Sequence, residues 1–136
     1  LEGLPENARR FKQALIEHDG FLIASPEYNS AYSPLLKNAI DWASRAEQQD
    51  EPPLQAFSGK SALLLATSPG ALGGMRGLVV LRMLLANIRV HVSATQLAIP
   101  KAHEAFDADG QLNEPNQKNL SAALSEFVDL TRRLQA

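Results

Sequence analysis

The sequence predicts an α/β fold, in which helices pack on a parallel β-sheet. Short apolar runs of strand length, at residues 21–25 and 60–67, alternate with segments that carry apolar residues at helical spacing. Each of these runs ends in a loop rich in proline, serine or glycine. Strands separated by helices of this length pair in parallel through right-handed crossovers.

The first half of the chain predicts two helices around a buried strand. A helix is expected over residues 5–18, with proline in its first turn and Gly20 as the C-terminal stop. The continuous apolar run 21–25 is typical of a strand that is buried on both faces. Ser33 and Pro34 then supply the N-cap and first position of a second helix, which fades after about residue 47.

The second half predicts two further strands and two further helices. A buried strand is expected at 60–67, and the helix that follows to residue 88 should be buried more than halfway round, with Val79 and Met83 among its covered residues. Residues 90–99 contain several β-branched side chains and predict one continuous third strand. A last helix should span 115–134. Its inner face is expected to consist of Leu120, Leu124, Phe127, Thr131 and Leu134.

The composition fits one globular domain over residues 1–136. Hydrophobic residues make up 45% and charged residues 21%, which is ordinary for a chain with a full core. The net charge of −2 gives no reason to expect a nucleic acid or a membrane as a partner. There is no cysteine, which excludes disulfides and thiolate chemistry and fits a reducing cytoplasm.

Two loops follow the first two predicted strands. The first loop, residues 26–32, begins with Pro26, which directs the backbone away from the strand, and offers Tyr28 for stacking and Asn29 to brace a turn. The second loop, residues 68–74, contains three glycines that would permit close approach to a ligand, and a helix N-terminus follows it. Taken alone, each loop is also explained as an ordinary turn.

The two loops are more informative together than apart. The carboxyl ends of neighbouring parallel strands lie side by side, and ligands of open α/β sheets bind at that edge. The sequence therefore predicts one crevice bordered by both loops. The second loop matches neither the phosphate loop of nucleotide triphosphatases nor the spacing of the dinucleotide fingerprint.

Four segments of the chain resemble the NADPH-dependent FMN reductase family. They are residues 25–29 (Ser-Pro-Glu-Tyr-Asn), 36–42 (Leu-Lys-Asn-Ala-Ile-Asp-Trp), 67–74 (Thr-Ser-Pro-Gly-Ala-Leu-Gly-Gly) and 105–112 (Ala-Phe-Asp-Ala-Asp-Gly-Gln-Leu). The similarity extends over essentially the whole chain from Leu4. It implies a flavodoxin-like, doubly wound parallel sheet in three α/β/α layers.

The resemblance also implies a bound FMN, with NAD(P)H as the hydride donor and a quinone, flavin, azo compound or metal oxyanion as the acceptor. In that case the isoalloxazine ring would be bordered by Pro26, Glu27, Tyr28, Asn29, Ser68, Pro69, Gly70 and Gly73. No catalytic side chain and no metal site are expected, because the flavin carries the chemistry. Family members commonly pair near the flavin, so a homodimer or homotetramer is expected as well.

The sequence departs from this family at its N-terminus. Members begin with a strand and a loop of the type Gly-Ser-x-Arg-x-x-Ser that cradles the FMN phosphate, and neither precedes Leu1. We therefore expect a sheet that lacks its first strands, with an open edge beside residues 21–25. This departure keeps a second hypothesis open: a non-catalytic flavodoxin-like module that acts by self-association or through a protein partner.

Five charged residues outside these loops also have alternative roles. Lys37 and Asp41 are four residues apart and predict an intrahelical ion pair. Arg76, in the first turn of the third predicted helix, is open to three roles: binding the NADPH phosphate, contacting a partner subunit or simple solvation. Asp107 and Asp109, just before Gly110, predict a tight turn rather than a calcium loop.

Overall fold

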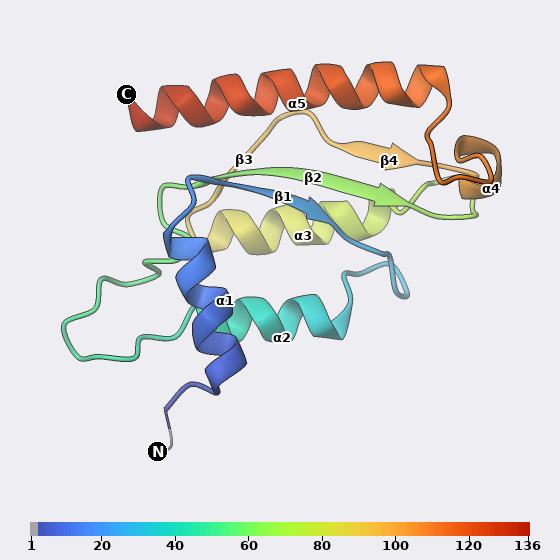
Figure 1. The fold of residues 1–136 in the computed structure, drawn as a ribbon. Helices are drawn as coiled ribbons and strands as arrows, with labels where there is room; N and C mark the ends of the chain where they lie inside the picture. Colours follow the sequence, from blue (N-terminus) through green and yellow to red (C-terminus); the bar gives the residue numbers. More distant parts are fainter. Residues whose placement is uncertain (1–2) are drawn as a thin grey trace.

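The fold of residues 3–136 is a parallel sheet with helices on both faces, as a computed structural model shows (Figure 1). The elements in chain order are α1 (Glu6–Ile16), β1 (Gly20–Ala24), α2 (Pro34–Ala43), β2 (Ser61–Thr67), α3 (Met75–Asn87), β3 (His91–Val92), β4 (Leu97–Ile99), α4 (Ala102–Ala105) and α5 (Glu114–Gln135). Strand β2 pairs in parallel with β1, β3 and β4, which confirms the α/β prediction. Leu1 and Glu2, part of the predicted single domain, lie outside the described residues.

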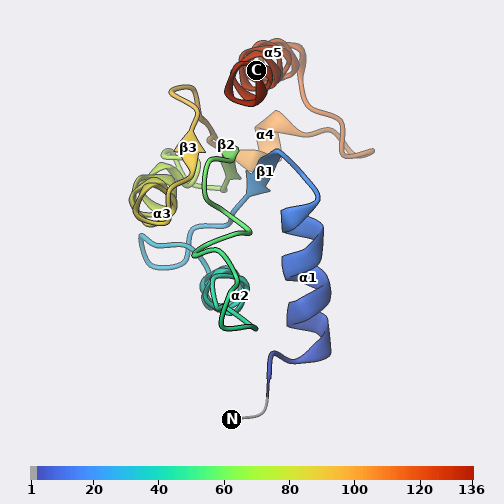
Figure 2. The ribbon, with the colours of Figure 1, turned by 90° about the vertical axis from the view of Figure 1, so that its left-hand side faces the viewer.

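The elements form three layers. Helix α5 lies on one side of the sheet, and α1, α2 and α3 lie on the other (Figures 1 and 2). Strand β2 is the centre of the core, with Leu63 and Leu64 fully buried, and α3 packs against it through Leu78, Leu81 and Leu85. No helix within residues 3–136 is both long and apolar enough to cross a membrane.

Local sequence signals account for the helix ends. Ser33 accepts a hydrogen bond from the Leu36 amide at 3.2 Å, so the predicted N-cap of α2 is confirmed. Asn113 caps α5 in the same way. At the C-terminus of α1, the Lys60 ammonium donates to the carbonyl oxygens of Ile16 and His18, and its burial lowers the pKa of Lys60.

The long connection between α2 and β2 is tied to α1 by a buried lysine. The Lys12 side chain is 4% exposed and bonds to the Glu51 carboxylate and, at 2.7 Å, to the Arg45 carbonyl oxygen. On the surface above it, Arg9 pairs with Glu47 at 2.9 Å. These contacts hold an otherwise irregular segment against the helix.

The prediction that residues 21–25 are buried on both faces was wrong for Leu22, which is 53% exposed. Side chains alternate along β1, so Leu22 faces the same side as Gly20, where a Cβ atom would lie 2.9 Å from Phe127 of α5. Helix α5 runs over β2 and β4 and leaves Leu22 uncovered. The other face of β1 carries Phe21, which packs edge-to-face on Phe57.

The prediction of one continuous strand over 90–99 was also wrong, because β3 and β4 are separate strands that pair with opposite ends of β2. The Ser93 amide still bonds to the Ala62 carbonyl oxygen of β2, and polar side chains of other elements then bond to the residues that follow. The Arg82 guanidinium bonds to Gln96 Oε1 at 2.9 Å and to the Val92 carbonyl oxygen at 3.4 Å, and Thr95 donates to the Glu126 carboxylate.

Two helix faces differ from those predicted. On α3, Val79 and Met83 are 58% and 69% exposed, because the helix buries only the side that meets the sheet. Helix α5 has the predicted extent, but its most buried residue is Ala123, and Leu134 near its end is exposed.

Candidate functional site

The ends of β1 and β2 lie side by side, and the two loops leave from there. Ala24 is opposite Leu65 in the register of the sheet, and the Ser25 amide continues the ladder with a 2.9 Å bond to the Leu65 carbonyl oxygen. The Ser68 amide, at the end of β2, bonds to the Ile99 carbonyl oxygen of β4 at 3.3 Å. Both loops therefore border one edge of the sheet, as predicted.

The first loop is a tight reverse turn. Tyr28 and Ala31 exchange two backbone hydrogen bonds of 2.8 and 3.0 Å, and Asn29 and Ser30 between them have φ angles of 50° and 68°. Two central residues with positive φ define a turn that Asn and Gly usually form. Asn29 therefore shapes the turn as expected. The Tyr28 side chain is 58% exposed at its start.

The glycines of the second loop have different roles. Gly73 has φ +61°, and a Cβ atom there would lie 2.6 Å from the Ile99 carbonyl carbon and 2.7 Å from the Pro100 nitrogen. Gly73 is thus needed for packing of the loop on β4. Gly70, by contrast, faces open space, where the nearest atom to a Cβ would be Ser68 Oγ at 3.8 Å. Of these two glycines, only Gly70 leaves room for a ligand.

The carbonyl oxygens of the second loop are used by the segment after β4. The Ala102 amide donates to the Ser68 carbonyl oxygen at 3.0 Å, and the Lys101 amide donates to the Gly70 carbonyl oxygen at 3.2 Å.

Several backbone amides of the two loops remain free for an outside acceptor. Within residues 3–136, no protein acceptor is found for the backbone N–H groups of Glu27, Gly70, Ala71 and Leu72.

Glu27 binds to the start of α3. Its carboxylate accepts hydrogen bonds from Arg76 Nε and Nη2 at 2.9 and 2.7 Å through one oxygen, and from the Gly77 amide at 3.1 Å through the other. The Gly77 hydrogen bond is the main cause of the lowered pKa of Glu27, and Arg76 adds to it. Arg76 is thus an ion-pair partner of the first loop.

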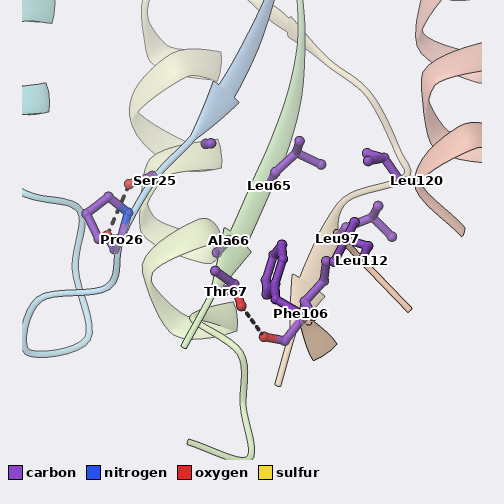
Figure 3. A pocket seen from close by; sticks show the side chains of 11 residues that line it. Ser25, Pro26, Leu65, Ala66, Thr67, Leu97, Phe106, Leu112 and Leu120 are labelled. Carbon is purple, nitrogen blue, oxygen red and sulfur yellow. Dashed lines mark hydrogen bonds between the residues drawn. The ribbon is translucent and has the colours of Figure 1, made fainter. Parts of the chain in front are cut away.

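An apolar cavity of about 380 Å³ lies beside the two loops, between the sheet and the segment after β4 (Figure 3). Its lining consists of Ala24, Ser25, Pro26, Leu65, Ala66, Thr67, Leu97, Ile99, Phe106, Leu112 and Leu120. Of the eight residues predicted to border a cofactor, only Pro26 belongs to this lining. The other seven lie on the turns beside the cavity.

Phe106 is the main cavity residue that sequence reasoning missed. Its ring lies beside Thr67 in Figure 3, and a backbone bridge between Phe106 and Leu112 brings both side chains to the cavity. Asp107 closes the turn between them by accepting from the Asp109 and Gln111 amides at 3.0 and 2.7 Å, which confirms the predicted tight turn. Residues 105–112 were among the segments that resemble the reductase family, but nothing in the sequence indicated that this segment lies beside β2.

Comparisons with known proteins agree with this arrangement. A family profile described as NADPH-dependent FMN reductase matches residues 2–104. The chain belongs to this family. It is 40% identical over 135 residues to an NAD(P)H-dependent FMN reductase of Pseudomonas aeruginosa, covering 98% of this chain and 70% of that protein.

Two further relatives support the same conclusion. A 2-hydroxy-1,4-benzoquinone reductase of Burkholderia is 34% identical, with 94% of this chain and 68% of that protein covered. The structure of FerB, a flavoenzyme NAD(P)H:(acceptor) oxidoreductase of Paracoccus denitrificans, superimposes with a TM-score of 0.82 at 33% identity, covering 95% of this chain and 69% of that one. The chain thus spans about two thirds of the length of these relatives.

The likeness to FerB confirms the flavodoxin-like fold. The residues at the sheet edge also fit the FMN of this family of reductases. Free amides of both loops suit the polar rim of a flavin ring, the space at Gly70 allows backbone approach, and the exposed Tyr28 ring offers a stacking surface. These features fit the flavin ring and not the FMN phosphate, because the cavity itself is too apolar to hold a phosphate.

Proposed function

We propose that the first and second loops bind the isoalloxazine ring of FMN in a flavin-dependent NAD(P)H oxidoreductase. The activity class follows from membership of the NADPH-dependent FMN reductase family. The main observation in support of the flavin site is that both loops meet at one edge of the sheet. Each loop has unpartnered amides, and there is open space at Gly70.

Each residue of the proposed site has a physical role. Pro26 and Pro69 fix the backbone as it leaves β1 and β2, and the amides of Glu27 and Gly70 are positioned to donate to ring oxygen and nitrogen atoms. Tyr28 borders the ring from the side of the first loop. When bound, FMN supplies the hydride chemistry between NAD(P)H and the acceptor.

Asn29, Ser68 and Gly73 complete the proposed set in supporting roles. Asn29 holds the positive φ of the first turn, Ser68 anchors the second loop to β4, and Gly73 allows that loop to pack tightly. None of them needs to act on a proton or form a bond with substrate. This fits an enzyme whose protein part supplies position and electrostatics.

The acceptor is proposed to be a quinone or a similar small, flat molecule. Relatives are named quinone reductases, NADPH:quinone oxidoreductases and a hydroxybenzoquinone reductase. The cavity beside the loops is lined by apolar side chains, including the Phe106 ring, which suits a hydrophobic aromatic compound. Free flavins, azo compounds and metal oxyanions are the alternative acceptors to assay.

A homodimer or homotetramer in the cytoplasm is proposed as the working form. An apolar stripe on α3, consisting of Met75, Val79 and Met83, is 44%, 58% and 69% exposed and lies at i, i+4 and i+8 along one face. The stripe is on the helix that starts at the second loop, so a partner chain bound there would lie near the site. Use of NAD(P)H, a reductant that cells make and regenerate internally, supports the location.

The site is tested by titrating the chain with FMN and following the visible absorbance and fluorescence of the flavin. We expect saturable binding, and we expect Gly70→Val to abolish it, because the valine side chain enters the space proposed for the ring. Gly3→Val is the matched control, since Gly3 also has room for a Cβ, 3.8 Å from its nearest neighbour, and lies outside the site. Unchanged FMN binding by Gly70→Val would refute the proposed site.

A further inference from the structure

The Glu27 side chain joins the first loop to the start of α3 without belonging to the cavity lining. It leaves the first loop, yet all its hydrogen bonds go to the first turn of α3, to the Arg76 guanidinium and the Gly77 amide. The carboxylate side chain is 10% exposed, while Arg76 is 59% exposed. This is therefore a mostly covered carboxylate held from two directions, unlike an ordinary surface ion pair.

The backbone of the first loop also packs directly on α3. A Cβ atom at Gly77 would lie 3.3 Å from Glu27 Cβ and 3.2 Å from the Ala31 carbonyl oxygen. The absence of a side chain at Gly77 lets the loop approach closely enough for the carboxylate to reach the Gly77 amide. The ion pair and the packing thus act at the same place.

The position of α3 is in turn set by the second loop. Gly74 is the last residue of that loop and the N-cap of α3, with φ 88°, and a Cβ there would lie 2.8 Å from Ala66 Cβ of β2. The start of α3 is thereby fixed to the end of β2. A first loop bound to Arg76 and Gly77 is consequently held at a fixed distance from the second loop.

We propose that Glu27 is a positioning residue, whose carboxylate sets the spacing between the two loops that border the flavin ring. This rests on the proposed function, and it gives the Glu27 side chain a role that requires no contact with the ring. Its backbone amide stays available to the ring while its side chain holds the loop. Loss of the carboxylate should loosen both loops and weaken the binding of FMN.

The experiment compares Glu27→Gln, Arg76→Gln and the double variant with the wild-type chain. Asp41→Asn is the matched control, because it removes an exposed carboxylate that pairs with Lys37 on α2, away from the loops. Amide hydrogen exchange is measured at Tyr28, Ala31 and Gly73, whose amides are bonded within the loops. The dissociation constant of FMN and the visible circular dichroism of the bound flavin are measured on the same samples.

We expect Glu27→Gln to speed exchange in both loops, to raise the FMN dissociation constant roughly five- to thirtyfold and to change the circular dichroism of the bound ring. The double variant should bind FMN about as weakly as Glu27→Gln, because both substitutions remove the same interaction between Glu27 and Arg76. Asp41→Asn should behave as wild type. A loss of global stability alone would shift exchange everywhere and leave the spectrum of the bound ring unchanged.

Two results would overturn the inference. Unchanged exchange in the loops of Glu27→Gln would show that the carboxylate does not hold them. Faster exchange with unchanged FMN affinity and spectrum would show that the spacing does not matter to the ring. Failure of the proposed function is seen separately, as an absence of FMN binding by the wild-type chain, while exchange in the ligand-free protein still tests whether Glu27 holds the loops.

Discussion

Ser30 and Asn29 give the first loop its shape through an unusual backbone conformation. Both have φ in the left-handed region, which costs non-glycine residues free energy, and asparagine tolerates it better than serine. The paired amides of Tyr28 and Ala31 compensate for part of this cost. Tyr28 is thereby kept exposed at the mouth of the proposed site.

Ser30→Gly is predicted to stabilise the protein. Glycine removes about 1–2 kcal/mol of left-handed strain and adds about 0.5–1 kcal/mol of chain entropy to the unfolded state, so a net gain of up to about 1.5 kcal/mol is expected. Urea unfolding measures it. Ser30→Ala is the control and should give no gain, since it keeps the Cβ atom; a decrease in stability for Ser30→Gly would show that the turn is not strained.

Because of Glu27, the folded protein is expected to lose stability in acid. The pKa of Glu27 is lowered in the folded state, so the carboxylate stabilises the fold above the ordinary glutamate pKa of about 4.3, and this contribution is lost as the pH falls through the lower folded-state value. Urea midpoints between about pH 6 and pH 3 should therefore fall more steeply for wild type than for Glu27→Gln. Parallel curves would show that Glu27 is not linked to folding.

At the scale of elements, the packing of the second loop on β4 depends on Gly73. Gly73→Ala is predicted to destabilise the protein by about 2–4 kcal/mol, from left-handed strain plus the close approach to the backbone of residues 98–100. Gly59→Ala separates the two effects, because Gly59 has φ +79° with no atom within 4 Å of its Cβ position. Thermal unfolding should show a larger loss for Gly73→Ala, and equal losses would mean that packing contributes nothing.

The sequence predicted the order and type of the main elements because their signals are local. Ser33 with Pro34 marks the start of α2, and apolar runs mark β1 and β2. It could not predict the break between β3 and β4, because Arg82 and Glu126, which bond to the intervening residues, belong to other elements. The exposure of Leu22 likewise depends on where α5 lies.

The site was predictable in part for the same reason. Parallel pairing alone brings the ends of β1 and β2 together, and the Lys37–Asp41 pair follows from helical spacing, with 2.6 Å between its charged atoms. The contact between Glu27 and Arg76 spans 49 residues and depends on how α3 docks. No local pattern contains that information.

At the scale of the whole molecule, the exposed stripe on α3 predicts self-association. Met83→Asp places a charge in the stripe at a side chain that is 69% exposed, so the fold of the single chain should be little affected. We expect light scattering to show a dimer or tetramer for wild type and a monomer for Met83→Asp. A monomeric wild type would refute the proposed assembly, and an unchanged variant would place the interface elsewhere.

The central claim is that two neighbouring loops at the carboxyl edge of the sheet hold a flavin ring. Its most direct test is a nitrogen-15 NMR titration of the labelled chain with FMN. We expect the amide shifts to concentrate at residues 27–29, 68 and 70–73, with those of Glu27, Gly70 and Ala71 among the largest. Shifts confined to other surfaces, or none at saturating FMN, would contradict it.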